Sequence, residues 1–285
     1  MAGCNGYGYT IKTGISILGY SLLTSCAKTS AHRLLAGWFP LALVFLWPAI
    51  GGAEEGREVA DDPVAISIVQ KADQVRFPAE GFEVGITINT TTPSGPSEPR
   101  KYRVLSKGNE NTVVMITEPA SERGQIMLMK GRDLWVFLPA VSQPVRLPLA
   151  QRLTGAVANG DLARANFVGD YKPQLLRTEK VDGEPMHVLE LTAIDRGVTY
   201  HRVLYWVRAS NYRPHKAEFY SLSDRLLKTC LYEKFERMAG RVRPTRLTMH
   251  DALREGEESV LDYADMKLRD LPDKIFTKDY LKRLE

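Results

Sequence analysis

The sequence predicts a mainly β protein of the α+β class, in which about eleven strands form one antiparallel sheet, a partly closed barrel with helices over one face. Three patterns predict this fold. Apolar and polar residues alternate over residues 82–89, as in a strand with one face in the core. Short apolar runs follow at close intervals, separated by polar turns, which is typical of antiparallel sheets. Helical spacing is confined to the start and the middle of the domain.

The elements are expected in the following order. One amphipathic helix over residues 63–78 is predicted by apolar residues at helical spacing, namely Ile66, Val69, Ala72 and Val75. The loop at residues 90–99 is rich in Thr, Pro, Ser and Gly, and it turns the first strand back into a second. The second and later strands are expected at residues 100–107, 112–118, 124–129, 133–138, 143–147, 186–194, 198–207, 214–222, 226–234, 242–251 and 257–267.

The middle of the domain has a different pattern. Residues 149–153 and 161–167 are expected to form short helices, the second with Asp161 as its N-cap. Their connection, residues 154–160, contains two glycines and lacks strong periodicity. Movable lids come from weakly stabilised segments of this kind. We therefore expect residues 149–167 to form a lid, with four candidate lid residues: Leu153, Gly155, Gly160 and Asp161.

The first 53 residues have the pattern of an export leader. A basic residue, an apolar run over residues 34–50 and three small residues precede the acidic pair at 54–55. A transmembrane anchor is the first alternative, although the run is short for a span and contains two prolines. The second alternative is a lipoprotein anchored at Cys26, which ends a lipoprotein-like box. The pattern favours a cleavable signal peptide, a mature domain of residues 54–285 and a periplasmic location.

Charge and cysteine content narrow the possible functions. The formal net charge is +4, but the first 53 residues hold three basic and no acidic residues. The nearly neutral remainder lacks the basic surface of a nucleic-acid-binding protein, so no nucleic-acid partner is expected. Without the leader, Cys230 is the only cysteine, and no intramolecular disulfide can form. Its apolar strand predicts a core residue rather than a catalytic thiol.

Some predicted strands are apolar on both faces, as at residues 134–138 and 203–207. A sheet with one face in water would alternate there. Helices on one face and loops on the other would explain the pattern, and so would an apolar groove that binds a long-chain ligand. The groove residues would then be Met127, Met129, Trp135, Phe137, Leu204 and Trp206. A one-residue register error would exchange them for Leu128, Leu134, Val136 and Tyr205.

Polar candidates are few. Arg202 shares a strand with Leu204 and Trp206, where it would either bind a lipid headgroup from the groove or lie in an ion pair on the outer face. Enzyme patterns are missing from the sequence: there is no GxSxG, Walker or dinucleotide glycine motif. The candidate metal ligands fall on four separate strands, at His187, His201, His215 and His250. We expect no enzyme, no metal and no cofactor.

Several motifs resemble, in order, those of the outer-membrane lipoprotein-sorting protein-like family. They include Gly-Arg-Asp-Leu-Trp-Val-Phe-Leu-Pro at residues 131–139, and further pieces at residues 145–148, 151–155, 159–162, 189–193, 205–207, 214–220 and 226–229. Together they cover most of residues 65–276. The resemblance implies a LolA-like half-barrel of about eleven strands, whose concave apolar face is lidded by helices. It also implies an acyl chain or a lipid-modified protein as the ligand.

Two functions from different classes fit this interpretation. A shuttle would hold a lipid or lipoprotein acyl chain and transfer it between an inner-membrane transporter and an outer-membrane acceptor. A sensor or accessory module would instead use the same half-barrel to bind a protein partner, such as a regulator or an export pump. The sequence does not choose between them.

Overall fold

The computed structural model describes residues 61–139, 141 and 143–281. The chain divides into two units, residues 1–56 and 57–285, and every described residue belongs to the second. The predicted signal peptide and the alternative lipidation site at Cys26 therefore lie outside the described residues. Within the described ranges, no helix is long and apolar enough to cross a membrane.

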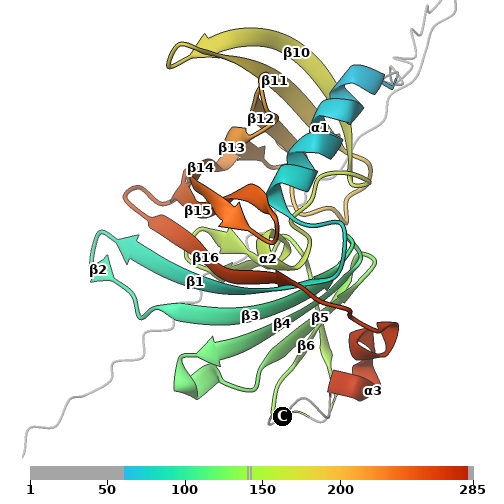
Figure 1. Cartoon of the computed structure of the whole chain (residues 1–285). Helices are drawn as coiled ribbons and strands as arrows, with labels where there is room; N and C mark the ends of the chain where they lie inside the picture. Colours follow the sequence, from blue (N-terminus) through green and yellow to red (C-terminus); the bar gives the residue numbers. More distant parts are fainter. Residues whose placement is uncertain (1–60, 140, 142, 282–285) are drawn as a thin grey trace, which may run out of the picture. The chain divides into compact units, whose positions relative to one another are not determined.

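Fourteen strands form one antiparallel sheet with the order β10-β11-β12-β13-β14-β15-β16-β1-β3-β4-β5-β6-β7, and β2 pairs with β1 (Figure 1). The edge strands β10 and β7 do not pair, so the barrel is unclosed, and the predicted fold class is confirmed. The strand bounds are β1 (Phe82–Thr92), β2 (Gly95–Pro96), β3 (Arg100–Lys107), β4 (Asn111–Glu118), β5 (Ile126–Lys130), β6 (Asp133–Phe137), β7 (Val145–Leu147), β10 (Tyr171–Val181), β11 (Glu184–Ala193), β12 (Arg202–Arg208), β13 (Pro214–Tyr220), β14 (Leu226–Met238), β15 (Arg241–Asp251) and β16 (Glu258–Leu268).

The edge strand β10 has no counterpart among the predicted strands. Its middle and end carry half-buried and exposed residues, and it contains Pro173. Proline is tolerated at a sheet edge because its missing N–H breaks no ladder hydrogen bond there. A register shift follows between Leu175 and Arg177, where the strand bulges. An edge strand therefore lacks the clean alternation by which a strand is recognised in a sequence.

Helix α1 (Pro63–Arg76) forms as predicted. The Asp62 carboxylate caps it by accepting a hydrogen bond from the Ala65 N–H at 2.9 Å. Its buried face is turned from the predicted one: Ile68 is buried, whereas Ile66 and Val75 are only half-buried. The helix packs against β10, β13 and β15.

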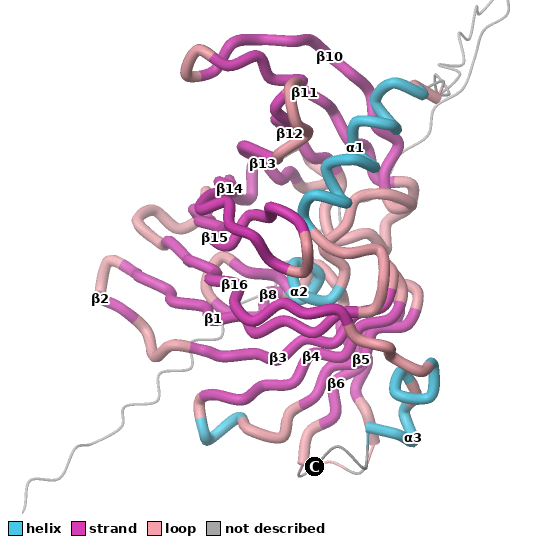
Figure 2. The backbone as a smooth tube through the Cα atoms, viewed as in Figure 1, coloured by secondary structure: helices cyan, strands magenta, loops and turns pink. Residues whose placement is uncertain are grey.

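One face of the sheet holds the main core. Helix α1, helix α2 (Asn159–Ala163) and the hairpin of β8 (Arg152–Thr154) and β9 (Val157–Ala158) lie against it, inside the curve of the sheet (Figure 2). We call this side the covered face and the other side the opposite face. The main core on the covered face includes Ile86 from β1, Leu189 from β11 and Tyr205 from β12.

The C-terminal segment covers part of the opposite face. It contains a 3-10 helix, η2 (Asp273–Phe276), and the one-turn helix α3 (Lys278–Leu281). Phe276 and Leu281 join a second apolar cluster with Val113 on β4 and Leu128 on β5. Strands β5 and β6 are therefore apolar on both faces because helices pack on one face and the C-terminal segment on the other.

Candidate ligand-binding face

Residues 149–167, the lid segment, cross the covered face as a β-hairpin followed by a short helix. The helix predicted over residues 149–153 is wrong, because β8 pairs there with β9. The second helix is α2, which begins before Asp161, and its N-cap is Ala158. Asp161 is the third helical residue, and its carboxylate accepts a hydrogen bond from the Ala158 N–H at 2.7 Å. The acidic side chain stabilises the helix start from inside the first turn instead of capping it.

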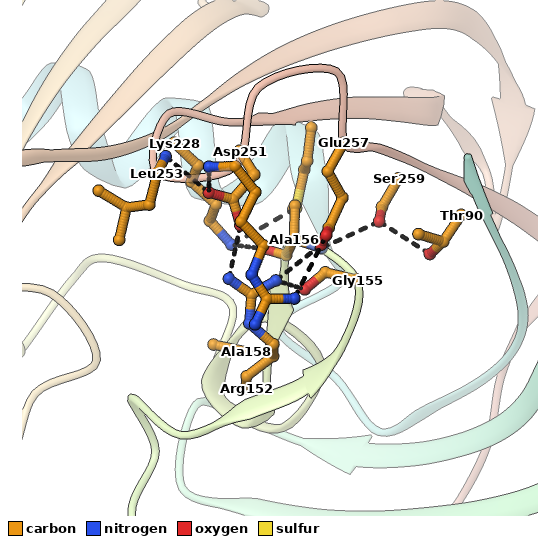
Figure 3. Close-up of polar contacts among 12 residues, drawn as sticks. Thr90, Arg152, Gly155, Ala156, Ala158, Lys228, Asp251, Leu253, Glu257 and Ser259 are labelled. Carbon is orange, nitrogen blue, oxygen red and sulfur yellow. Dashed lines mark hydrogen bonds and ion pairs between the residues drawn. The ribbon is translucent and has the colours of Figure 1, made fainter. Parts of the chain in front are cut away.

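Arg152 ties the lid segment to the far end of β15 (Figure 3). Its guanidinium contacts the Asp251 carboxylate at 2.5 Å and the Glu257 carboxylate at 2.7 Å. The two acidic side chains are 3% and 7% exposed, whereas that of Arg152 is 36% exposed. Burial alone would raise the pKa of Asp251, but hydrogen bonds from Arg152 and the Leu253 N–H outweigh it and keep this pKa below its ordinary value.

Lys228 of β14 forms a second tie beneath the lid segment. Its ammonium donates a hydrogen bond to the Ala156 carbonyl at 2.9 Å and forms an ion pair with Asp161. Tyr200 donates a further hydrogen bond to the Asp161 carboxylate at 2.9 Å. Both side chains of the ion pair are nearly buried. A buried ion pair is costly to break, because separation leaves a charge without a partner.

Gly155 and Gly160 are required where the lid segment touches the sheet. Gly155 has φ +49°, and a Cβ there would lie 2.2 Å from the Ser259 hydroxyl and 2.4 Å from that of Thr90. The Ser259 hydroxyl accepts a hydrogen bond from the Ala156 N–H at 3.0 Å (Figure 3). A Cβ on Gly160 would lie 2.1 Å from the Thr199 hydroxyl. The glycines thus permit close approach, while Leu153 packs against the main core.

The end of the lid segment is held by α1. The Asp73 carboxylate accepts hydrogen bonds from the Phe167 and Val168 N–H groups at 2.8 and 2.9 Å. Arg76 donates to the Ala165 carbonyl at 2.5 Å and lies over the Phe167 ring at 4.7 Å. Asp73 and Arg76 also pair with each other at 3.2 Å, fully inside the core. Side-chain contacts of α1 and the sheet therefore hold the segment at both ends.

The space beside the lid segment is divided among small cavities and one open cleft. Among the described residues, two cavities of about 20 Å³ each lie on the covered face, and a more open cleft of about 180 Å³ lies beside the lid segment, lined by residues that include Arg152, Tyr200 and Lys228. The first small cavity is lined by Phe77, Val104 and Leu162, and the second by Arg76 and Phe219 among others. Each small cavity holds about one water molecule. The two small cavities are therefore too small for an acyl chain.

The six predicted groove residues do not lie together. Met127 and Met129 belong to the main core on the covered face. Trp135 and Phe137 pack in the second cluster on the opposite face, and Leu204 and Trp206 pack in a third cluster there. The placement of these four is corrected: the covered-face residues on their strands are Leu134, Val136, Val203, Tyr205 and Val207. Ligand contact at any of the six stays a prediction.

Arg202 also lies away from the covered face. Its guanidinium pairs with Asp224 at 2.5 Å and with Glu190 at 3.3 Å, and it stacks on the Tyr220 ring at 3.9 Å. The alternative of an ion-paired arginine describes this geometry, and headgroup binding by Arg202 stays a prediction. Cys230 is a core residue, as predicted, and its burial raises the pKa of the thiol to about 12. In the described part of the chain, no group of three or more His, Cys, Asp or Glu residues is placed to hold a metal.

The fold and this face define a class of protein: an open half-barrel with an apolar concave side, over which one segment is held by ion pairs and hydrogen bonds. A LolA superfamily protein from Nitrosomonas europaea is 65% identical, with a TM-score of 0.74, covering 78% of this chain and 100% of that chain. The same fold occurs in a putative outer membrane lipoprotein-sorting protein domain from Vibrio parahaemolyticus (22% identity, TM-score 0.68, 77% of this chain and 99% of that chain). It also occurs in a DUF1329 family protein from Desulfovibrio piger (24%, TM-score 0.67, 76% and 98%).

The chain belongs to the LolA superfamily. Residues 108–283 also match a family model whose description is "uncharacterized protein". No curated protein matches the chain.

Proposed function

We propose that this protein binds the acyl chains of a lipid or lipoprotein on its covered face and carries them through the periplasm. The proposal is supported mainly by the contrast between the apolar sheet beneath the lid segment and the polar contacts that help to hold the segment there. Beneath it the sheet is apolar, with Val104, Leu189 and Tyr205 all nearly inaccessible to solvent. The lid segment is held to the sheet and α1 by ion pairs and hydrogen bonds as well as by buried apolar side chains. The part-exposed contacts of Arg152 can exchange with water when the segment moves, whereas the buried pair of Lys228 and Asp161 is costlier to separate.

An acyl chain would replace the apolar contacts that the lid segment makes. Leu162 and Phe167 insert from the segment into the main core. Each CH₂ group removed from water contributes about 0.8 kcal/mol. A bound acyl chain with many CH₂ groups would therefore compensate for the lost contacts of these two side chains and for the lost ion pairs of the lid segment. Membership in the LolA superfamily supports the same ligand class.

The carrier function is tested by fatty-acid binding with a matched pair of variants. Val104 of β3 lines the cavity on the covered face, whereas Val113 of the neighbouring β4 is buried on the opposite face. Threonine has nearly the same shape as valine, but its hydroxyl is costly to bury without a partner, by about 1–3 kcal/mol. We expect Val104→Thr to weaken binding of a fluorescent fatty acid about tenfold, and Val113→Thr to leave it within twofold.

Both variants are first checked for folding by circular dichroism and urea unfolding. Equal effects of the two substitutions, or no fatty-acid binding by the wild type, would contradict the carrier function. Mass spectrometry of lipids extracted from protein purified from its native cells then identifies the bound class.

A further inference from the structure

A basic surface lies where the β14–β15 turn meets α1. Strand β15 packs against α1. Arg243 fixes the contact, since its guanidinium donates to the Gln74 and Val75 carbonyls of α1 at 2.9 and 3.2 Å, and to the Met238 carbonyl at 3.2 Å. The turn is therefore held rigidly at the last turn of α1 (Figure 1).

Five further basic residues surround this contact. Arg237 and Arg241 flank the turn, and Lys234 of β14 has a φ of +47°. Arg213, from the β12–β13 turn, lies over the Phe235 ring of β14 at 5.2 Å, and Lys71 of α1 donates to the neighbouring Tyr212 hydroxyl at 3.2 Å. We call this set the basic tip: Lys71, Arg213, Lys234, Arg237 and Arg241.

Across the described ranges, none of the five basic-tip residues forms an ion pair. Elsewhere exposed basic side chains are commonly paired, as in Arg103 with Glu83 and Arg246 with Asp262. Within the described ranges, other exposed basic residues such as Lys172 and Arg225 also form no ion pair, so the basic tip is distinguished by the gathering of five basic residues without an ion pair around one turn. Glu233 and Glu236 lie beside Lys234 and Arg237 in the chain, and Glu80 acts electrostatically on Arg243, so the five basic residues outnumber these three acidic ones.

The turn also presents apolar atoms between these charges. Val242 is 37% exposed, and Met238 and Ala239 are half-buried. Basic residues around a small apolar tip match the chemistry of a bilayer surface, which offers anionic headgroups above acyl chains. The five charges surround a projecting turn rather than line a pocket, which favours an extended anionic surface over a small anion.

We infer that the basic tip docks the protein on an anionic phospholipid surface. The inference rests on the proposed function, because it supplies the membrane with which a lipid carrier exchanges its ligand. Docking at the basic tip would also bring the membrane close to the covered face, where the ligand is proposed to bind. Phe77, directly after α1, lines the cavity that remains under the lid segment.

The inference is tested with residues 57–285, a compact unit by itself, because the solved Nitrosomonas europaea structure matches only 78% of this chain over its own whole length. Binding is measured by co-sedimentation with vesicles of phosphatidylcholine alone or with 30% (about one lipid in three) phosphatidylglycerol. Each basic residue near such a surface contributes about 1 kcal/mol, a factor of about five. Reversal of two charges in Arg237→Glu/Arg241→Glu should therefore weaken binding at least about 20-fold. The control is Lys172→Glu/Arg225→Glu, which reverses two exposed charges outside the basic tip.

Binding to the anionic vesicles that is lost in the tip variant and in high salt, but kept in the control, supports the inference. No binding to these vesicles overturns it, and an acidic protein segment would then be the occupant to test. Equal loss in both variants also overturns it, since only general charge would matter. Fatty-acid binding in solution is measured on the same variants. If it is absent from the wild type the carrier function fails, whereas the vesicle result still reports on the basic tip.

Discussion

Removal of Arg152 should open the lid segment. In Arg152→Ala, the Asp251 and Glu257 carboxylates lose a shared cation, although Asp251 keeps hydrogen bonds from the Leu253 and Arg254 N–H groups. The loss of one partner of a buried pair costs several kcal/mol, but the 36% exposure of Arg152 means that solvent screens this pair. We therefore expect the closed state to lose about 1–2 kcal/mol.

A closed state weakened by this amount increases the open population about 5- to 30-fold. Under the proposed function the open state binds the acyl chain, so the apparent Kd for a fluorescent fatty acid should decrease by up to the same factor. Hydrogen exchange in residues 149–167 should become faster, while exchange in β6 stays unchanged. The control is Arg246→Ala, which removes an arginine from the ion pair with Asp262 on the sheet. Unchanged or weaker fatty-acid affinity in folded Arg152→Ala would refute the reasoning.

Three further predictions concern the same face. Gly155→Ala should lower the free energy of unfolding by about 1–3 kcal/mol in urea titrations, because its Cβ would strike Ser259 at a positive φ; a loss below 0.5 kcal/mol would contradict the close approach. The buried Cys230 thiol should resist labelling in the native protein and react faster in Arg152→Ala, as thiol-labelling kinetics would show; equal rates would mean that the segment does not shield it. The pKa of Asp251 is lowered in the folded protein, so its contribution to stability is complete above the ordinary pKa of about 4 and is lost as the pH decreases through the folded value. Hydrogen exchange in the lid segment should therefore become faster in acid only below about pH 4. An onset near pH 6 would indicate a histidine instead.

The class of fold follows from local patterns. Alternation over residues 82–89, helical spacing in α1 and closely spaced polar turns were sufficient for an open antiparallel sheet with helices on one face. These patterns arise from side-chain geometry within a few residues, since strands repeat every two residues and helices every 3.6. The buried cysteine also follows from its strand alone.

The sidedness of β6 and β12 was decided by the tertiary structure. Alternation identifies the inner face only when the other face is polar, and here the C-terminal segment and a third cluster make both faces apolar. Trp135 and Trp206 could therefore not be assigned to a face from their own strands. The apolar residues within 271–281 could have indicated that a further segment packs on the opposite face.

The ion pairs that hold the lid segment could not be predicted from the sequence either. Arg152 meets Asp251 and Glu257, and Lys228 meets Asp161, only because the sheet curves back over the lid segment. The polar residues involved look like ordinary surface charges in the sequence. The two glycines marked the segment, but as signs of flexibility, whereas the structure uses them for close packing against Ser259 and Thr199. Local composition determined where the lid segment lies, and long-range contacts determined what holds it.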